Sequence, residues 1–157
     1  MPLAEAAETV DYAATAFLIL CASLVLLMTI PGLALFYGGM TRTKSVLNMM
    51  MMSFGAMGVV GIIYVLYGYS MSFGSENVGG IIANPFEKFG LAGTDTIINP
   101  FGYEGYGNIP ELAFVGFQLT FAVITVALIS GAVADRVKFS TWMVFAALWV
   151  TFAYFPI

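Results

Sequence analysis

Three phenylalanines and one glutamine are the side chains best placed to do chemistry in this sequence. Phe114, Phe117 and Phe121 recur at positions i, i+3 and i+7, and Gln118 lies among them. In a helix, Phe117 and Phe121 are one turn apart and share a face. An aromatic face of this kind can hold a small cation through the ring quadrupole. Spacing alone favours the simpler interpretation, in which the rings face lipid or pack in a core.

Groups on which enzymes and metal sites depend are scarce in this chain. There is no His, which removes the commonest general base and the commonest neutral metal ligand. The one cysteine, Cys21, has no histidine to activate it, so we predict a small buried hydrophobe. No nucleophile–base pair or metal-binding cluster can be assembled from these residues. We therefore predict neither an enzyme nor a metal or cofactor site.

Composition places the chain in a membrane. Of its 157 residues, 61% are hydrophobic and only 9% are charged, with a net charge of −4. A soluble domain is about 25% charged and about 45–50% apolar. The same figures exclude a disordered chain, a disulfide scaffold and a nucleic-acid binder. The sequence therefore predicts an integral membrane protein.

Four long uncharged stretches are predicted to span the bilayer. They are residues 12–37, 45–74, 112–134 and 139–157, which hold 26, 30, 23 and 19 residues. A spanning helix needs about 20 mainly apolar residues. The stretches are continuously apolar rather than alternating, which favours helices over a barrel. We predict an all-α integral membrane fold with four transmembrane helices, forming one unit over residues 1–157.

Charged residues predict the direction of each span. Four of the five basic residues lie in the two short turns between spans: Arg42, Lys44, Arg136 and Lys138. The N-terminal segment holds only acids, and the connection 75–111 holds five acids against Lys88. By the positive-inside rule, the short turns are cytoplasmic. The N-terminus, the loop 75–111 and the end of the chain at Ile157 are then outside.

Local signals refine the spans. Pro31 removes one helical hydrogen bond, so the first helix should kink or end there, and Thr29 could satisfy a freed carbonyl. Gly38 and Gly39 are expected to end that helix. Small residues inside the second and third spans predict close helix packing, and they are Gly55, Gly58, Gly61, Ala127 and Gly131.

The long loop 75–111 is rich in turn residues, and its stretch 104–108 should be irregular. Loops of this length are often functional, and cover over a vestibule is one possible role. A solvated extracellular connector is the simpler interpretation.

Several segments match the pattern of a known family. The run from Thr29 to Gly39 (TIPGLALFYGG) is specific, and the pattern from Phe117 to Ala122 (FQLTFA) follows it in the right order. Further matching residues are Arg42, Lys44, Asn48, Tyr67–Ser70, Phe73, Gly74, Ile124, Thr125, Gly131, Ala132, Asp135, Arg136, Phe139, Ser140, Trp149 and Tyr154–Ile157. Together they resemble the ammonium transporter, methylammonium permease and Rhesus family. The resemblance covers nearly all of residues 13–157 and is weakest in the loop.

This resemblance implies an eleven-helix fold with the N-terminus outside, built from two inverted five-helix repeats. It also implies a homotrimer with one pore per subunit, multi-pass in the plasma or inner membrane. Ammonium or ammonia would be the substrate, with methylammonium as an analogue. Some members bind a PII signalling protein at the cytoplasmic face.

Site residues follow from the same resemblance. Phe117 matches the phenylalanine of the outer substrate-recruitment vestibule. Phe121 matches the outer phenylalanine of the pore gate and also borders that vestibule. Cation–π attraction of about 0.5–2 kcal/mol can select a small cation without a fixed carboxylate that would trap it. Gln118 is a candidate polar residue on the pore side, although a bond to a neighbouring helix is the simpler role.

Length is where the sequence departs from the family. Members are much longer, and their later helices bring an aspartate and the twin pore histidines, which have no counterpart here. We expect a partial sequence, with a degenerate gene or a shortened protein as alternatives, and no transport by residues 1–157 alone. Ammonium transport is the expected function. A non-conducting interaction or regulatory subunit that co-assembles with full-length homologues is the main alternative, and an unrelated four-span channel or anchor is another.

Overall fold

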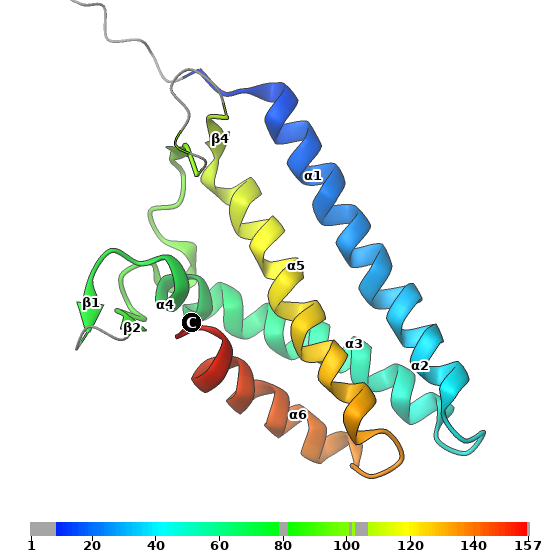
Figure 1. The fold of residues 1–157 in the computed structure, drawn as a ribbon. Coiled ribbons are helices and arrows are strands. Elements are labelled where there is room, and N and C mark those ends of the chain that lie inside the picture. The colour runs from blue at the N-terminus through cyan, green and yellow to red at the C-terminus, as the bar shows by residue number, and fades with distance from the viewer. Residues whose placement is uncertain (1–8, 79–81, 101, 103–106, 157) are drawn as a thin grey trace, which may run out of the picture.

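Long helices dominate the structure, a computed structural model that describes residues 9–78, 82–100, 102 and 107–156 (Figure 1). The first helix consists of α1 (Tyr12–Leu27), a π-helical turn (Met28–Leu33) and α2 (Ala34–Met40). The second consists of α3 (Val46–Ile63), a π-helical turn (Tyr64–Gly68) and α4 (Tyr69–Phe73). The third is α5 (Glu111–Ile129) with a 3-10 turn (Ser130–Val133), and the fourth is α6 (Phe139–Trp149) with a π-helical turn (Val150–Tyr154).

Three of these helices are long and apolar enough to cross a membrane. They are Tyr12–Met40, Val46–Phe73 and Glu111–Val133, with 29, 28 and 23 residues. The fourth, Phe139–Tyr154, is apolar but shorter. At 1.5 Å per residue its 11 α-helical and 5 π-helical residues reach roughly 24 Å. The predicted helical membrane protein is confirmed, and the fourth span stays a prediction.

The core lies where α3, α5 and α6 meet. Each helix turns small or β-branched residues inward, and the fully buried ones include Ala56, Val60, Ala122, Val126, Ala127, Ala146 and Val150. The Trp142 indole is also fully buried, and its N–H donates to the Met52 carbonyl oxygen at 2.9 Å. α1 packs along α5 outside this core (Figure 1). Many α1 side chains are therefore exposed, and Cys21 is only partly buried.

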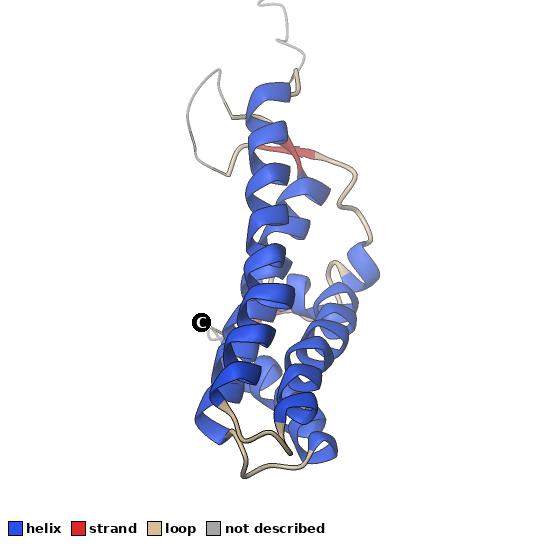
Figure 2. Ribbon diagram, turned by 90° about the vertical axis from the view of Figure 1, so that its right-hand side faces the viewer, coloured by secondary structure: helices blue, strands red, loops and turns tan. Residues whose placement is uncertain are grey.

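Both short turns lie at the same end of the structure, and α1 and β4 begin at the opposite end (Figure 1). The turns carry Arg42, Lys44, Arg136 and Lys138. Figure 2 shows the same alternation of helices from the side. At the other end, the Asp11 carboxylate caps α1 by accepting the Ala14 N–H at 2.9 Å. The predicted topology requires both basic turns at one end of the helices and the start of α1 at the other, and the structure has this arrangement.

The first helix was predicted to kink or end at Pro31 and to end at Gly38 and Gly39. It continues across Pro31 in a π-helical turn, and the Thr29 hydroxyl donates to the Val25 carbonyl oxygen at 2.8 Å. It also runs beyond Gly38 and Gly39 to Met40, which is three residues past the predicted end of the span at residue 37. The reason is packing, because α2 lies along α3 and a Cβ at Gly38 would come within 3.1 Å of the Met50 side chain.

The loop after α4 is more ordered than a solvated connector. It contains two antiparallel strand pairs, β1 (Asn77–Val78) with β2 (Ile82–Ala83) and β3 (Ile97–Ile98) with β4 (Ile109–Pro110). A 3-10 turn (Phe89–Leu91) lies between the pairs. Thr94 and Ile109 are buried, so the described part of the loop packs onto the helix ends. Most of the stretch predicted to be irregular, residues 104–106, lies outside the described residues.

Candidate functional site

Phe117 and Phe121 lie on one face of α5. Their ring centroids are 4.9 Å apart and the ring planes meet at 82°, an edge-to-face contact of the kind that favours aromatic pairs. This confirms that their spacing brings the two rings together. The Phe121 ring is 37% exposed, and the Thr125 hydroxyl one turn further on donates to the Phe121 carbonyl oxygen at 2.7 Å. The helix therefore presents an aromatic pair that is open to a neighbour or a ligand.

A hollow of about 490 Å³ opens beside α5. α5 contributes Gln118 and Thr125, which are two turns apart and share a face. The remaining lining residues come from the second and fourth helices: Tyr64, Ser72, Phe73, Trp149, Ala153 and Tyr154. Phe121 lies between Gln118 and Thr125 along the helix, but neither it nor Phe117 lines the hollow. The structure thus brings Gln118, and not the aromatic pair, to this opening, which we call the outer hollow.

Phe117 lines a second hollow, of about 420 Å³, between α1, α3 and α5. Gly61 also lines it, and a Cβ at Gly61 or Gly58 would meet no atom of the described chain within 4 Å. Other small residues are closely packed, with Gly55 against Met143 and Phe139, and Gly131 against Tyr37. The predicted close packing is therefore confirmed at Gly55 and Gly131, whereas no described residue supplies a packing partner at Gly58 and Gly61.

Two π-helical turns shape the outer hollow. Tyr64 begins one of them, while Trp149 precedes the other and Tyr154 ends it. Single π-turns within α-helices are frequent at functional sites. The Tyr64 hydroxyl is buried and has no hydrogen-bond partner in the described part of the chain. Nothing in the residue spacing predicted these turns.

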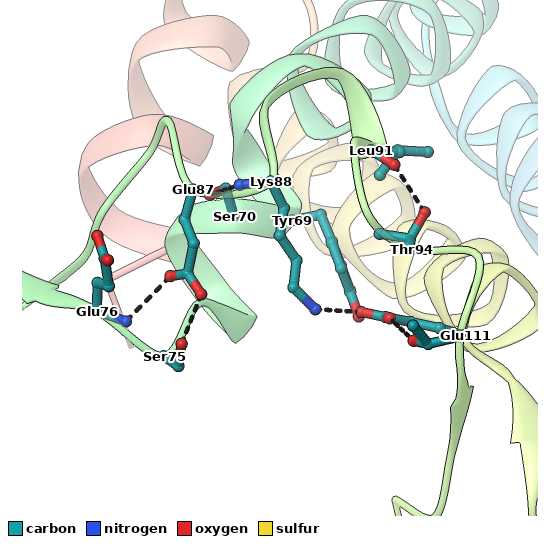
Figure 3. Close-up of polar contacts among 10 residues, drawn as sticks. Tyr69, Ser70, Ser75, Glu76, Glu87, Lys88, Leu91, Thr94 and Glu111 are labelled. Atoms are coloured by element: carbon teal, nitrogen blue, oxygen red, sulfur yellow. Dashed lines mark hydrogen bonds and ion pairs between the residues drawn. The ribbon is translucent and has the colours of Figure 1, made fainter.

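A polar cluster at the loop end of α5 was missed in the sequence (Figure 3). Glu111 was treated as the last residue of a solvated loop, yet it begins α5 and is 2% exposed. Its carboxylate accepts the Tyr69 hydroxyl at 2.7 Å and the Thr96 hydroxyl at 2.5 Å, and it forms an ion pair with Lys88. A usable signal was present, because Lys88 is the only cation of the loop and Glu111 directly precedes an apolar span.

A second carboxylate organises the start of the loop. Glu87 accepts the Glu76 backbone N–H at 3.0 Å and the Ser75 hydroxyl at 2.5 Å (Figure 3). These hydrogen bonds, with the Glu76 amide first, hold the pKa of the Glu87 carboxyl below its usual value. Among the described residues, no group of three or more His, Cys, Asp or Glu side chains could hold a metal ion.

Known proteins resemble this chain in both sequence and structure. The sequence model of the Ammonium Transporter Family matches residues 16–157. An "Ammonium transporter" of Mycobacterium tuberculosis H37Rv is 53% identical, with 91% of this chain and 32% of the relative covered. One of Aquifex aeolicus is 45% identical, with 94% and 33% covered. The crystal structure of Saccharomyces cerevisiae Mep2 superposes with a TM-score of 0.75 at 28% identity, covering 94% of this chain and 32% of that one. The chain thus spans about a third of the length of these relatives, and the two bacterial ones are named ammonium transporters.

Proposed function

This chain belongs to the Ammonium Transporter Family, and we propose that it forms the outer recruitment region of a protein that carries ammonium or ammonia across a membrane. The observation that carries the proposal is the edge-to-face pair of Phe117 and Phe121 on α5, the helix that also contributes the polar groups of Gln118 and Thr125 to the outer hollow. Relatives that bear the name ammonium transporter support the choice of substrate.

The proposed mechanism rests on cation–π attraction. An ammonium ion entering the hollow gives up part of its water shell, and an aromatic face offsets about 0.5–2 kcal/mol of that loss. Phe117 recruits the ion, Phe121 acts as the outer gate, and Gln118 offers a hydrogen-bonding amide. The described helices carry no Asp, Glu, Lys or Arg after their first residue, so no fixed carboxylate along this wall would hold the ion.

The membrane arrangement is part of the proposal. The two basic turns lie at one end, which supports a cytoplasmic position for them and an N-terminus that is extracellular or periplasmic. We propose a plasma or inner membrane location, four of eleven spans within this chain, and a homotrimer. A PII signalling protein would meet the cytoplasmic turns.

The second candidate function is a non-conducting subunit that packs against full-length homologues. The apolar hollow between α1, α3 and α5 supports it, because a Cβ at Gly61 would meet no described atom within 4 Å, which leaves space for a side chain of a neighbouring helix. Co-purification with a tagged homologue would favour this role, and strict self-association would contradict it.

Uptake of labelled methylammonium tests the transport proposal. We would join the chain after Ile157 to the remaining two thirds of the M. tuberculosis relative and express the chimera in cells that lack ammonium transporters. Saturable uptake by the chimera, and none by the chain alone, is expected. No uptake by a well-expressed chimera would overturn the proposal, and so would saturable uptake by the chain alone.

Phe121→Ala in the chimera tests the gate. Uptake should fall about 2- to 30-fold, the equivalent of losing about 0.5–2 kcal/mol of cation–π attraction, while assembly stays intact. Phe145→Ala is the matched control, because Phe145 is 38% exposed but lies on α6. Unchanged uptake in Phe121→Ala, or an equal loss in Phe145→Ala, would refute the gate assignment.

A further inference from the structure

The Lys88 side chain ends on a set of groups suited to an ammonium head (Figure 3). We propose that Glu111 and Tyr69 form a binding site for primary alkylammonium ions, and that Lys88 occupies this site as a tethered ligand. The site is defined by its own contacts. Its role at the outer mouth rests on the proposed function.

Each group of the site faces the Lys88 ammonium with suitable chemistry. Glu111 Oε1 accepts from Lys88 Nζ and from the Tyr69 hydroxyl, and Oε2 accepts from Thr96. Lys88 Nζ also lies 5.5 Å from the centroid of the Tyr69 ring, within the range of about 6 Å for cation–π attraction. A carboxylate and a ring face around one nitrogen select a cation that carries N–H donors.

The carboxylate needs a cation at this position. Glu111 is 2% exposed, and a buried charge without a partner is strongly destabilising. Tyr69 and Thr96 donate hydrogen bonds but carry no compensating charge. Lys88 is therefore the group that neutralises the site, and removing it leaves a buried anion that a free cation can compensate.

Lys88 reaches the site from the solvent side. Its side chain is 24% exposed, whereas its backbone N–H is fixed by Ser70 Oγ at 2.9 Å. Ser70 Oγ in turn donates to the Asn84 carbonyl oxygen at 2.7 Å. The hydrogen bond that holds the Lys88 backbone is thus independent of the contact between Lys88 Nζ and Glu111. Truncation of the side chain should open a path to Glu111 without releasing the loop.

The Phe73 ring separates the site from the outer hollow. Tyr69 stacks on Phe73 with centroids 5.3 Å apart, and Phe73 lines the hollow. By holding Lys88 on Glu111, the chain keeps a buried carboxylate from capturing an arriving ammonium ion. Transport through an aromatic mouth needs such masking, because a trapped cation would not move on.

Chemical rescue of a truncated lysine tests the proposal in purified protein in detergent micelles. Lys88→Ala removes three carbons and the ammonium group, which together correspond to n-propylammonium. Its thermal midpoint should fall below that of the unchanged protein and rise again with n-propylammonium. A rise of about 3–6 °C is expected at ten times the dissociation constant. Methylammonium should be less effective.

Lys88→Leu supplies a second and differently shaped variant. It keeps the inner part of the stem and lacks only the last carbon and the ammonium group, so methylammonium should now exceed n-propylammonium. Tetramethylammonium, which has no N–H donor, should restore neither variant. Adding Glu111→Gln to either variant should abolish the response.

Several results would overturn the site. They are no response to any alkylammonium, an equal response to tetramethylammonium, or a response that survives Glu111→Gln. If Lys88→Ala folds only when amine is present, recovery of folded protein replaces the thermal midpoint, and the same order of amines is required. Binding is measured without transport, so an inactive chimera would leave this test unaffected.

Discussion

Replacing Gly68 with alanine should destabilise the contact between the second and fourth helices. A Cβ at Gly68 would lie 2.4, 2.7 and 2.8 Å from three carbons of the Phe155 ring. Phe155 is 1% exposed, so its ring cannot move into solvent. Neighbouring rings also confine it, with centroids at 5.9 Å for Tyr64, 6.2 Å for Tyr67 and 6.0 Å for Tyr154.

Gly58→Ala isolates the cost of this clash. Both substitutions replace a helical glycine with alanine, which favours the folded state by about 0.5–1 kcal/mol. At Gly58 a Cβ meets nothing within 4 Å in the described chain, so only that gain applies. At Gly68 overpacking adds a cost of about 1–3 kcal/mol. The difference between the two variants in the free energy of unfolding should therefore be about 1–3 kcal/mol, with Gly68→Ala the less stable.

Unfolding by SDS in mixed micelles, followed by tryptophan fluorescence, measures this difference. Phe155→Leu should relieve the clash, so the double variant Gly68→Ala/Phe155→Leu should be more stable than the sum of the single effects. The reasoning fails if Gly68→Ala is as stable as Gly58→Ala. It also fails if the two effects at Gly68 and Phe155 simply add.

Two other perturbations follow from the hydrogen bonds. Trp142→Phe should lower the free energy of unfolding by about 0.6–1.7 kcal/mol, because it removes the indole bond to the Met52 carbonyl at 2.9 Å, and an unchanged SDS midpoint would contradict this. The pKa of Glu87 is lowered in the folded chain, so its contribution to loop stability is present above the unfolded pKa and is lost as pH falls through the folded pKa. NMR of the carboxyl groups should find the pKa of Glu87 below the ordinary glutamate value, and this pKa should be higher in Ser75→Ala. A Glu87 pKa that is unchanged in Ser75→Ala would refute the role of the Ser75 hydrogen bond.

Much of the helical architecture follows from the sequence, because uninterrupted apolar runs in lipid have few alternatives to helices. The placement of Arg42 and Arg136 in two separate turns then fixes the alternation of directions, which the structure reproduces. The contact between Phe117 and Phe121 is equally local, since residues four apart share a helix face.

Features that depend on contacts between residues far apart in the chain could not be predicted from the sequence. The helix runs past Gly39 because α2 packs on α3, and neither propensity nor spacing encodes that contact. The burial of Glu111 depends on Lys88, which lies 23 positions earlier in the chain. Gly58 and Gly61 are of the residue type that allows close helix packing, but no helix of the described chain packs closely against them. Local sequence patterns thus predict where the helices lie, whereas the polar contacts between elements, such as that of Glu111 with Lys88, depend on tertiary structure.

The π-helical turn between α3 and α4 lets the chain carry one extra residue ahead of the outer rings without turning those rings away. A π-turn accommodates one residue more than an α-turn, and the Tyr64 and Tyr69 rings meet across it at 6.1 Å, five positions apart. Because the wider turn absorbs that residue, deleting one position within Tyr64–Gly68 would restore a regular α-helix in which α4 faces nearly the same way relative to α3. Tyr69 would then still face Glu111, and only the wide turn would be lost. Such turns let evolution add or remove one residue in a membrane helix without reorienting the side chains that follow it.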